Sequence, residues 1–220
     1  MNRTFDVAVV GATGAVGEAM IEILEQRKFP VRQLYPLASS RSAGKTVRFQ
    51  GRDVPVGDLA EFDFSRTQVG LFSPGASVSA VYAPKAAAAG CVVVDNTSQF
   101  RYEDDIPLVV PEVNAEKIAD YRNRGIIANP NCSTIQMLVA LKPIYDAVGI
   151  ERVNVCTYQA VSGTGKEAIE ELEFAVHQLN YKVVMLGGLM RRPVPALAAE
   201  HPDASKFVEW YDVIGIDSPH

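Results

Sequence analysis

FDVAVVGATGAVG, residues 5–17, joins a short apolar run directly to a glycine-rich loop. The run has the character of a strand that is buried on both faces of a parallel sheet. After the loop, residues 15–26 repeat apolar side chains at helical spacing, which predicts an amphipathic helix. A strand that passes through spaced glycines into a helix is typical of the first turn of a nucleotide-binding fold.

The glycine-rich loop predicts a phosphate site. Gly11 and Gly14 permit a tight turn and a close approach of the backbone to a pyrophosphate. Thr13, Ala15 and Val16 lie where the helix begins, and a helix N-terminus offers N–H groups and a partial positive charge to an anion. The alternative interpretation is an ordinary glycine-rich turn between a strand and a helix.

Strand-like and helix-like segments alternate along the rest of the N-terminal part. We expect strands at residues 34–38, 69–72, 91–94 and 125–128, and helices at 77–89 and 132–145. Such alternation implies right-handed crossovers and an α/β fold with a Rossmann-type, doubly wound parallel sheet. From Glu151 the pattern changes to a strand of a different sheet near 153–159, followed by a helix at 164–179. We therefore expect a dinucleotide-binding domain at 1–130 and a second, α+β domain at 131–220.

The composition of the chain limits the kinds of partner that it can bind and the cell compartment in which we expect it. The chain has 220 residues and a net charge of -5, which argues against nucleic acid or an anionic membrane as partner. No apolar run approaches the length of a membrane span or of a signal-peptide core. Three cysteines without metal-type spacing predict reduced thiols in a cytoplasmic protein and no metal site, and Cys91 and Cys156 lie in apolar runs typical of the core.

The end of the second strand predicts which dinucleotide binds. NAD-binding folds usually place an acidic residue there for the ribose hydroxyls, but this chain has none between Glu25 and Asp53. Ser39, Arg41 and Ser42 stand in its place, and a guanidinium with nearby hydroxyls suits a 2′-phosphate. NADP is therefore favoured over NAD. The alternative is a solvated polar loop, because serine and arginine are common on surfaces.

Cys132 follows an apolar strand and opens the helix expected at 132–145. At a helix N-terminus the macrodipole favours the thiolate over the thiol. A thiolate there can attack a carbonyl carbon, and the free N–H groups of the helix can stabilise the oxyanion that develops. The alternative is a buried cysteine that happens to begin a helix.

Six motifs occur in order along the chain: GATG (11–14), SSRSAG (39–44), DNTSQFR (95–101), VVPEVN (109–114), NPNCST (129–134) and YQAVSGTG (158–165). Together they closely resemble the aspartate-semialdehyde dehydrogenases over residues 5–173. The Asn-Cys-Ser-Thr sequence at residues 131–134 distinguishes this chain from the related N-acetylglutamyl-phosphate reductases. The resemblance implies a homodimer whose second domain serves catalysis and dimerisation, and this chain holds only part of that domain.

The resemblance also implies a reaction and the residues that perform it. Cys132 would attack the aldehyde of aspartate semialdehyde, NADP would take the hydride, and phosphate would release aspartyl phosphate; biosynthesis of lysine, methionine and threonine runs the reverse. Gln159 would orient the acyl intermediate, while Arg101 and Asn131 would bind phosphate or substrate. Further cofactor contacts would come from Ser73, Ser162 and Gly163.

Without the family resemblance, two of these residues could equally have a purely structural role. Arg101 is followed by Asp104 and Asp105 and could form a surface ion pair with either of them. Gln159 could be a polar residue on the face of a sheet.

The chain departs from the family pattern after about residue 173. The acid/base histidine of the family would fall at Ala198, and His177, His201 and His220 all stand in the wrong context for it. Residues 181–220 could form a strand and a short helix.

The leading hypothesis is an NADP-dependent, phosphate-using aldehyde dehydrogenase, and the second is a truncated nucleotide-binding homologue without turnover. A third is a related reductase that acts on another acyl phosphate. A partial second domain would also leave a sheet face exposed, which predicts weak solubility or altered assembly.

Overall fold

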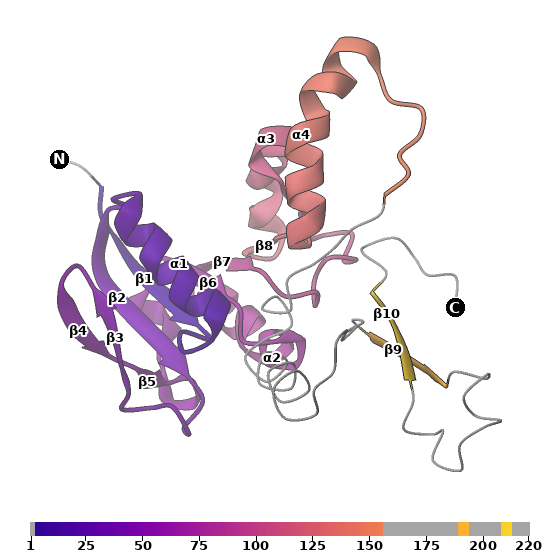
Figure 1. Ribbon diagram of the computed structural model, residues 1–220. Helices are drawn as coiled ribbons and strands as arrows, with labels where there is room; N and C mark the ends of the chain where they lie inside the picture. Colours follow the sequence, from indigo (N-terminus) through magenta and orange to yellow (C-terminus); the bar gives the residue numbers. More distant parts are fainter. Residues whose placement is uncertain (1–2, 156–188, 194–207, 213–220) are drawn as a thin grey trace. The chain divides into compact units, whose positions relative to one another are not determined.

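The computed structural model describes residues 3–155 together with strands β9 (Leu189–Pro193) and β10 (Val208–Asp212) (Figure 1). The chain divides into two compact units, Met1–Val153 and Asn154–His220. In the second unit, β9 and β10 pair antiparallel, with Arg191 opposite Trp210. The domain boundary near residue 130 stays a prediction. No helix among the described residues is long and apolar enough to cross a membrane.

A six-stranded parallel sheet organises the first unit, in the order β5-β2-β1-β6-β7-β8. Its strands are β1 (Phe5–Val10), β2 (Val31–Ala38), β5 (Gly57–Asp58), β6 (Val69–Phe72), β7 (Val92–Asp95) and β8 (Ile126–Ala128). The α-helices are α1 (Ala15–Gln26), α2 (Ala76–Ala88), α3 (Pro111–Asn114) and α4 (Cys132–Val148), and the 3-10 helices are η1 (Leu59–Glu61), η2 (Phe64–Arg66) and η3 (Ala115–Asn123). The doubly wound parallel sheet expected from the alternation is confirmed.

Strand β1 is buried on both faces, as its continuous apolar run predicts. Val7 and Val9 belong to a core cluster with Ile21 of α1, whereas Ala8 and Val10 belong to a second cluster on the opposite face with residues of α2. Because successive side chains of a strand point to opposite faces, helices must cover both sides of this sheet.

The hairpin of β3 (Thr46–Phe49) and β4 (Arg52–Pro55) was not expected from the sequence pattern. Its two turn residues, Gln50 and Gly51, have φ angles of 49° and 73°, the left-handed values that tight two-residue hairpins require. Phe49 is buried in the cluster that contains Ile21 of α1, so the hairpin covers that helix. The alternation of polar and apolar residues along β3 was the signal that could have found it.

Other elements differ from expectation mainly at their ends. β2 begins at Val31 rather than at residue 34. Its first residues pair with β1 on one side only, and because the other side is an open edge they can be polar, so they lack the apolar pattern of a buried strand. Residues 152–155 have no regular secondary structure, and the remainder of the strand expected near 153–159 and the helix expected at 164–179 lie outside the described residues. Cys91 is buried in the core as predicted, and this burial raises the pKa of its thiol.

Candidate active site

The carboxyl ends of the parallel strands meet at one edge of the sheet, and the loops that follow them carry the predicted site residues. Gly11 follows β1, Ser39 follows β2, Ser73 follows β6, Asn96 follows β7 and Asn129 follows β8. This edge is where open α/β sheets bind their ligands. The fold therefore brings the nucleotide loop and the Cys132 segment to the same edge, although they are more than 100 positions apart in the sequence.

The glycine-rich loop is closely packed against the end of β6. A Cβ atom on Gly11, whose φ is 85°, would lie 2.7 Å from the carbonyl oxygen of Ser73, and one on Gly17 would clash with the carbonyl oxygen of Gly11. The Gly11 and Ala12 N–H groups both donate to Leu37 O, at 2.9 and 3.1 Å. Gly14 is the N-cap of α1 and has no side chain to cover the first N–H groups of that helix. The loop thus presents bare backbone at a helix N-terminus, which is the geometry that binds phosphate.

The loop after β2 turns tightly beside this site. Ser42 N donates to Ser39 O at 2.8 Å, and Arg41 is exposed at the middle of the turn. Sequence reasoning missed one acidic neighbour, Asp58, which β5 places in register with Ala38 at the end of β2. Its side chain accepts a 2.9 Å hydrogen bond from Ala60 N and so caps η1.

A buried carboxylate anchors the segment that follows β7. Asp95 is fully buried, and its oxygens accept hydrogen bonds from Ser79 Oγ at 3.1 Å and from Thr97 N and Oγ1, both at 2.9 Å. Ser79 comes from α2, so the carboxylate ties that helix to the turn leading towards Arg101. Sequence reasoning did not identify Asp95 as a separate feature, because nothing in its local pattern shows what it contacts.

Arg101 is held by two backbone carbonyl groups. Its Nε donates to Asn129 O and its Nη2 donates to Asn96 O, both at 3.0 Å. Partial burial lowers the pKa of the guanidinium, whereas the negative charge of the nearby Asp95 opposes this shift. Arginine stays charged in proteins, so a positive charge is held on the backbone carbonyl of Asn129, three residues before Cys132. The ion pair with Asp104 or Asp105 considered from sequence is not formed in the described part of the chain, where Asp105 pairs with Arg124 at 3.1 Å.

Cys132 begins α4 and its side chain is exposed. Asn131 is the N-cap of this helix, and its Oδ1 accepts a hydrogen bond from Ser133 N at 2.9 Å. The Sγ atom lies 4.0 Å from Asn131 Oδ1 and 4.0 Å from Ser133 Oγ. Because Oδ1 faces the helix, the amide nitrogen of Asn131 is the part of that side chain available to an anion or an acyl oxygen. The alternative of a buried cysteine is excluded.

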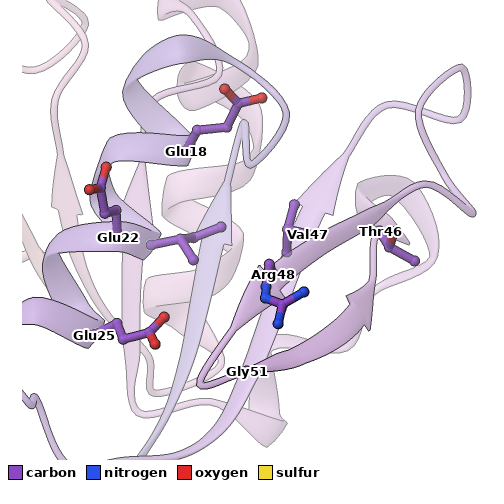
Figure 2. Close-up of a pocket in the computed structure, with 8 residues that line it drawn as sticks. Glu18, Glu22, Glu25, Thr46, Val47, Arg48 and Gly51 are labelled. Atoms are coloured by element: carbon purple, nitrogen blue, oxygen red, sulfur yellow. The ribbon is translucent and has the colours of Figure 1, made fainter.

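An open pocket of about 660 Å³ lies between α1 and the β3–β4 hairpin (Figure 2). Glu18, Glu22 and Glu25 of α1 line one side and Arg48 of β3 the other. Glu25 Oε2 accepts a hydrogen bond from Gln50 N at 3.1 Å, which joins the helix to the hairpin turn. Three carboxylates would repel the phosphates of a nucleotide, so this pocket does not suit the cofactor.

Several predicted residues lie outside the described part of the chain. They are Gln159, Ser162 and Gly163 of the last motif, and His177, His201 and His220. Their roles stay predictions.

Two family models match the chain. The semialdehyde dehydrogenase NAD-binding domain matches residues 6–121, and the semialdehyde dehydrogenase dimerisation domain matches residues 141–198. The second match extends past residue 173, where the resemblance by motif ends. Both the nucleotide-binding fold and a partial second domain are consistent with these matches.

Individual relatives agree with the family models. The aspartate-semialdehyde dehydrogenase of Shewanella violacea is 68% identical over 172 residues, which cover 78% of this chain and 51% of that protein. The crystal structure of aspartate semialdehyde dehydrogenase II of Vibrio cholerae, complexed with ASA, has a TM-score of 0.79 and 61% identity, and the match covers 84% of this chain and 55% of that one. The enzyme of Candida albicans, solved with NADP, has a TM-score of 0.57 at 29% identity, covering 67% of this chain and 48% of the other. The chain thus spans about half the length of these relatives, and it belongs to the aspartate-semialdehyde dehydrogenase family.

Proposed function

We propose that the chain carries the nucleotide site and the nucleophile of an NADP-dependent, phosphorylating aspartate-semialdehyde dehydrogenase. The observation that carries this proposal is the position of Cys132, exposed at the N-terminus of α4 and at the same sheet edge as the glycine-rich loop. In the biosynthetic direction the enzyme would reduce aspartyl phosphate on the route to lysine, methionine and threonine. Localisation in the cytoplasm fits the reduced thiols expected from the sequence.

The described residues fit a dinucleotide. The loop from Gly11 to Gly17 offers a cradle that a Cβ atom would fill, and the exposed Arg41 supplies a cation for a 2′-phosphate. When bound, NADP supplies the hydride acceptor. Thr13, Ala15, Val16, Ser39 and Ser42 would contact it through backbone or hydroxyl groups, with Ser73 beside the loop. The solved relative from Candida albicans, which holds NADP, supports this choice of cofactor.

The nucleophile acts by forming and breaking one carbon–sulfur bond. The Cys132 thiolate attacks the aldehyde carbon and gives a thiohemiacetal, whose oxyanion the first N–H groups of α4 can stabilise. Loss of hydride from that carbon leaves a thioester on Cys132. A phosphate oxygen then attacks the thioester carbon, the carbon–sulfur bond breaks, and the sulfur departs as thiolate. Gln159 would orient the acyl group, and Ser162 and Gly163 would lie along the cofactor.

Phosphate would bind beside the sulfur. Arg101 uses two of its five N–H donors on backbone carbonyls and keeps the others for an anion. The Asn131 amide nitrogen is the second donor, because its oxygen already caps α4. A positive charge next to Cys132 would stabilise both the bound phosphate and the departing thiolate.

A homodimer is the proposed assembly. The match of residues 141–198 to a dimerisation domain supports it, and α4 carries exposed apolar residues at Ile144, Tyr145 and Val148. Sedimentation equilibrium of this chain tests the assembly, and a stable monodisperse monomer would count against it.

The activity is tested by NADPH formation from aspartate semialdehyde and phosphate, followed by absorbance in the chain and in Cys132→Ala. Cys91→Ala is the matched control, because Cys91 is buried in the core away from the edge. Turnover that is lost in Cys132→Ala and kept in Cys91→Ala supports the proposal. NADP binding without turnover in the parent chain would instead favour a nucleotide-binding homologue without turnover, and substrate profiling would reveal a reductase for another acyl phosphate.

A further inference from the structure

Two asparagines join the ends of neighbouring strands next to the proposed phosphate site. Asn96 follows β7 and Asn129 follows β8, and Asn129 Nδ2 donates to Asn96 Oδ1 at 2.7 Å. Their backbones extend the sheet, since Asn96 N donates to Phe72 O and Asn129 N donates to Asp95 O, both at 2.8 Å. Both side chains are half-buried, where an amide hydrogen bond is protected from competition by water.

The same two residues hold Arg101. Their backbone carbonyls accept the Nη2 and Nε hydrogen bonds of its guanidinium, so Asn96, Arg101 and Asn129 form a closed ring of three hydrogen bonds. A guanidinium is a rigid planar fork, and it can reach both carbonyls only if they keep a set spacing. The amide bond between the two side chains maintains that spacing.

The ring also leads directly to the nucleophile. Asn129 precedes Pro130, which is buried and restricts the residue before it to extended backbone. Asn131 then caps α4, and Cys132 is the first residue of that helix. Only two residues therefore separate the ring from the thiol, so a shift of Asn129 would move both Arg101 and Cys132.

We propose that Asn96 and Asn129 form a positioning pair, whose side-chain hydrogen bond sets Arg101 relative to Cys132 for binding of phosphate beside the thiol. This inference rests on the proposed function for the identity of the anion. Neither asparagine is placed in contact with substrate or cofactor. A role limited to holding the loop would affect stability but would leave phosphate affinity unchanged.

The test uses Asn96→Leu, Asn129→Leu and the double variant, because leucine keeps the size of asparagine and both backbone carbonyls. The readout is the phosphate concentration that halves the rate at which iodoacetamide alkylates Cys132. We expect this concentration to rise about tenfold in each single variant, because a tenfold loss of phosphate affinity corresponds to the free energy of about one hydrogen bond. The double variant should stay within about twofold of the singles, since partners that act as a unit are not additive.

Matched controls separate positioning from general damage. Asn123→Leu, an exposed asparagine at the end of η3, should leave phosphate protection unchanged. The dissociation constant for NADP should stay within about twofold in all variants, because the glycine-rich loop follows a different strand. Unchanged phosphate protection in both single variants would overturn the proposal, as would multiplicative effects in the double.

A second measurement does not depend on phosphate. The Arg101 Nε–H group donates to Asn129 O, so its hydrogen exchange, followed by NMR, should be slow in the parent and fast in both single variants. If phosphate fails to protect Cys132 in the parent, the proposed phosphate site is wrong. The exchange rates still test in that case whether the pair holds Arg101: rates that are unchanged in the variants refute it, and faster rates support it.

Discussion

Substitutions at and around the Asp95 carboxylate should lower the free energy of unfolding by different, predictable amounts. Asp95→Ala removes the acceptor of three hydrogen bonds from Ser79 and Thr97, and leaves those buried donors without a partner. A buried donor left unsatisfied costs about 1–3 kcal/mol, and hydroxyls can partly recover by rotating to nearby carbonyls. We therefore expect the free energy of unfolding to fall by roughly 3–5 kcal/mol, a large share of the roughly 5–15 kcal/mol typical of a domain.

Two milder variants calibrate this prediction. Asp95→Asn keeps the oxygen that accepts from Ser79 and Thr97 N and can donate to Thr97 Oγ1, so we expect a loss of about 1–2 kcal/mol. Ser79→Ala leaves the carboxylate its two bonds from Thr97 and should cost about 0.5–1.5 kcal/mol.

The assay is urea unfolding, monitored by far-UV circular dichroism. At a slope near 2 kcal/mol per molar urea, the midpoint should fall by about 2 M in Asp95→Ala and by less than about 1 M in the other two variants. A fall of less than about 1 kcal/mol in Asp95→Ala would refute the reasoning. An Asp95→Asn variant as unstable as Asp95→Ala would show that the charge, rather than the hydrogen bonds, is what matters.

Three further predictions concern other parts of the first unit. The hydrogen bonds of Arg32 lower the pKa of the buried Asp6 carboxyl below its ordinary 3.8, so their stabilisation is present above about pH 4 and is lost as pH falls through the lowered value. The difference in melting temperature between the parent and Arg32→Ala should therefore shrink below pH 4, and a constant difference from pH 7 to 3 would contradict this. Gly17→Ala, whose Cβ would lie 2.8 Å from Gly11 C, should lose about 1–3 kcal/mol in urea unfolding, whereas Gly14→Ala, with its nearest contact at 3.3 Å, should lose clearly less. Arg41→Ala should weaken NADP binding about tenfold or more in calorimetry and leave NAD binding within about twofold; equal effects on both would exclude a 2′-phosphate contact.

Local sequence was enough for the features whose causes lie close together in the chain. The run from Phe5 to Gly17 predicted a strand, a glycine turn and a helix, because each depends on neighbouring residues and on side-chain periodicity. The N-terminal position of Cys132 on α4 was predicted for the same reason. The hairpin around Gln50 was missed, since its strands are short and its turn lacks the usual asparagine.

The site itself depends on contacts between distant residues. Asn96 and Asn129 are 33 positions apart, and Asp58 reaches the end of β2 only because β5 joins the sheet there. No local pattern encodes such pairings, because they depend on strand order and register, which are properties of the packed sheet. By itself, therefore, the sequence determined the kind of fold, the family and the residues able to do chemistry. The tertiary structure decided which of them meet, since only the packed parallel sheet gathers its strand ends at one edge.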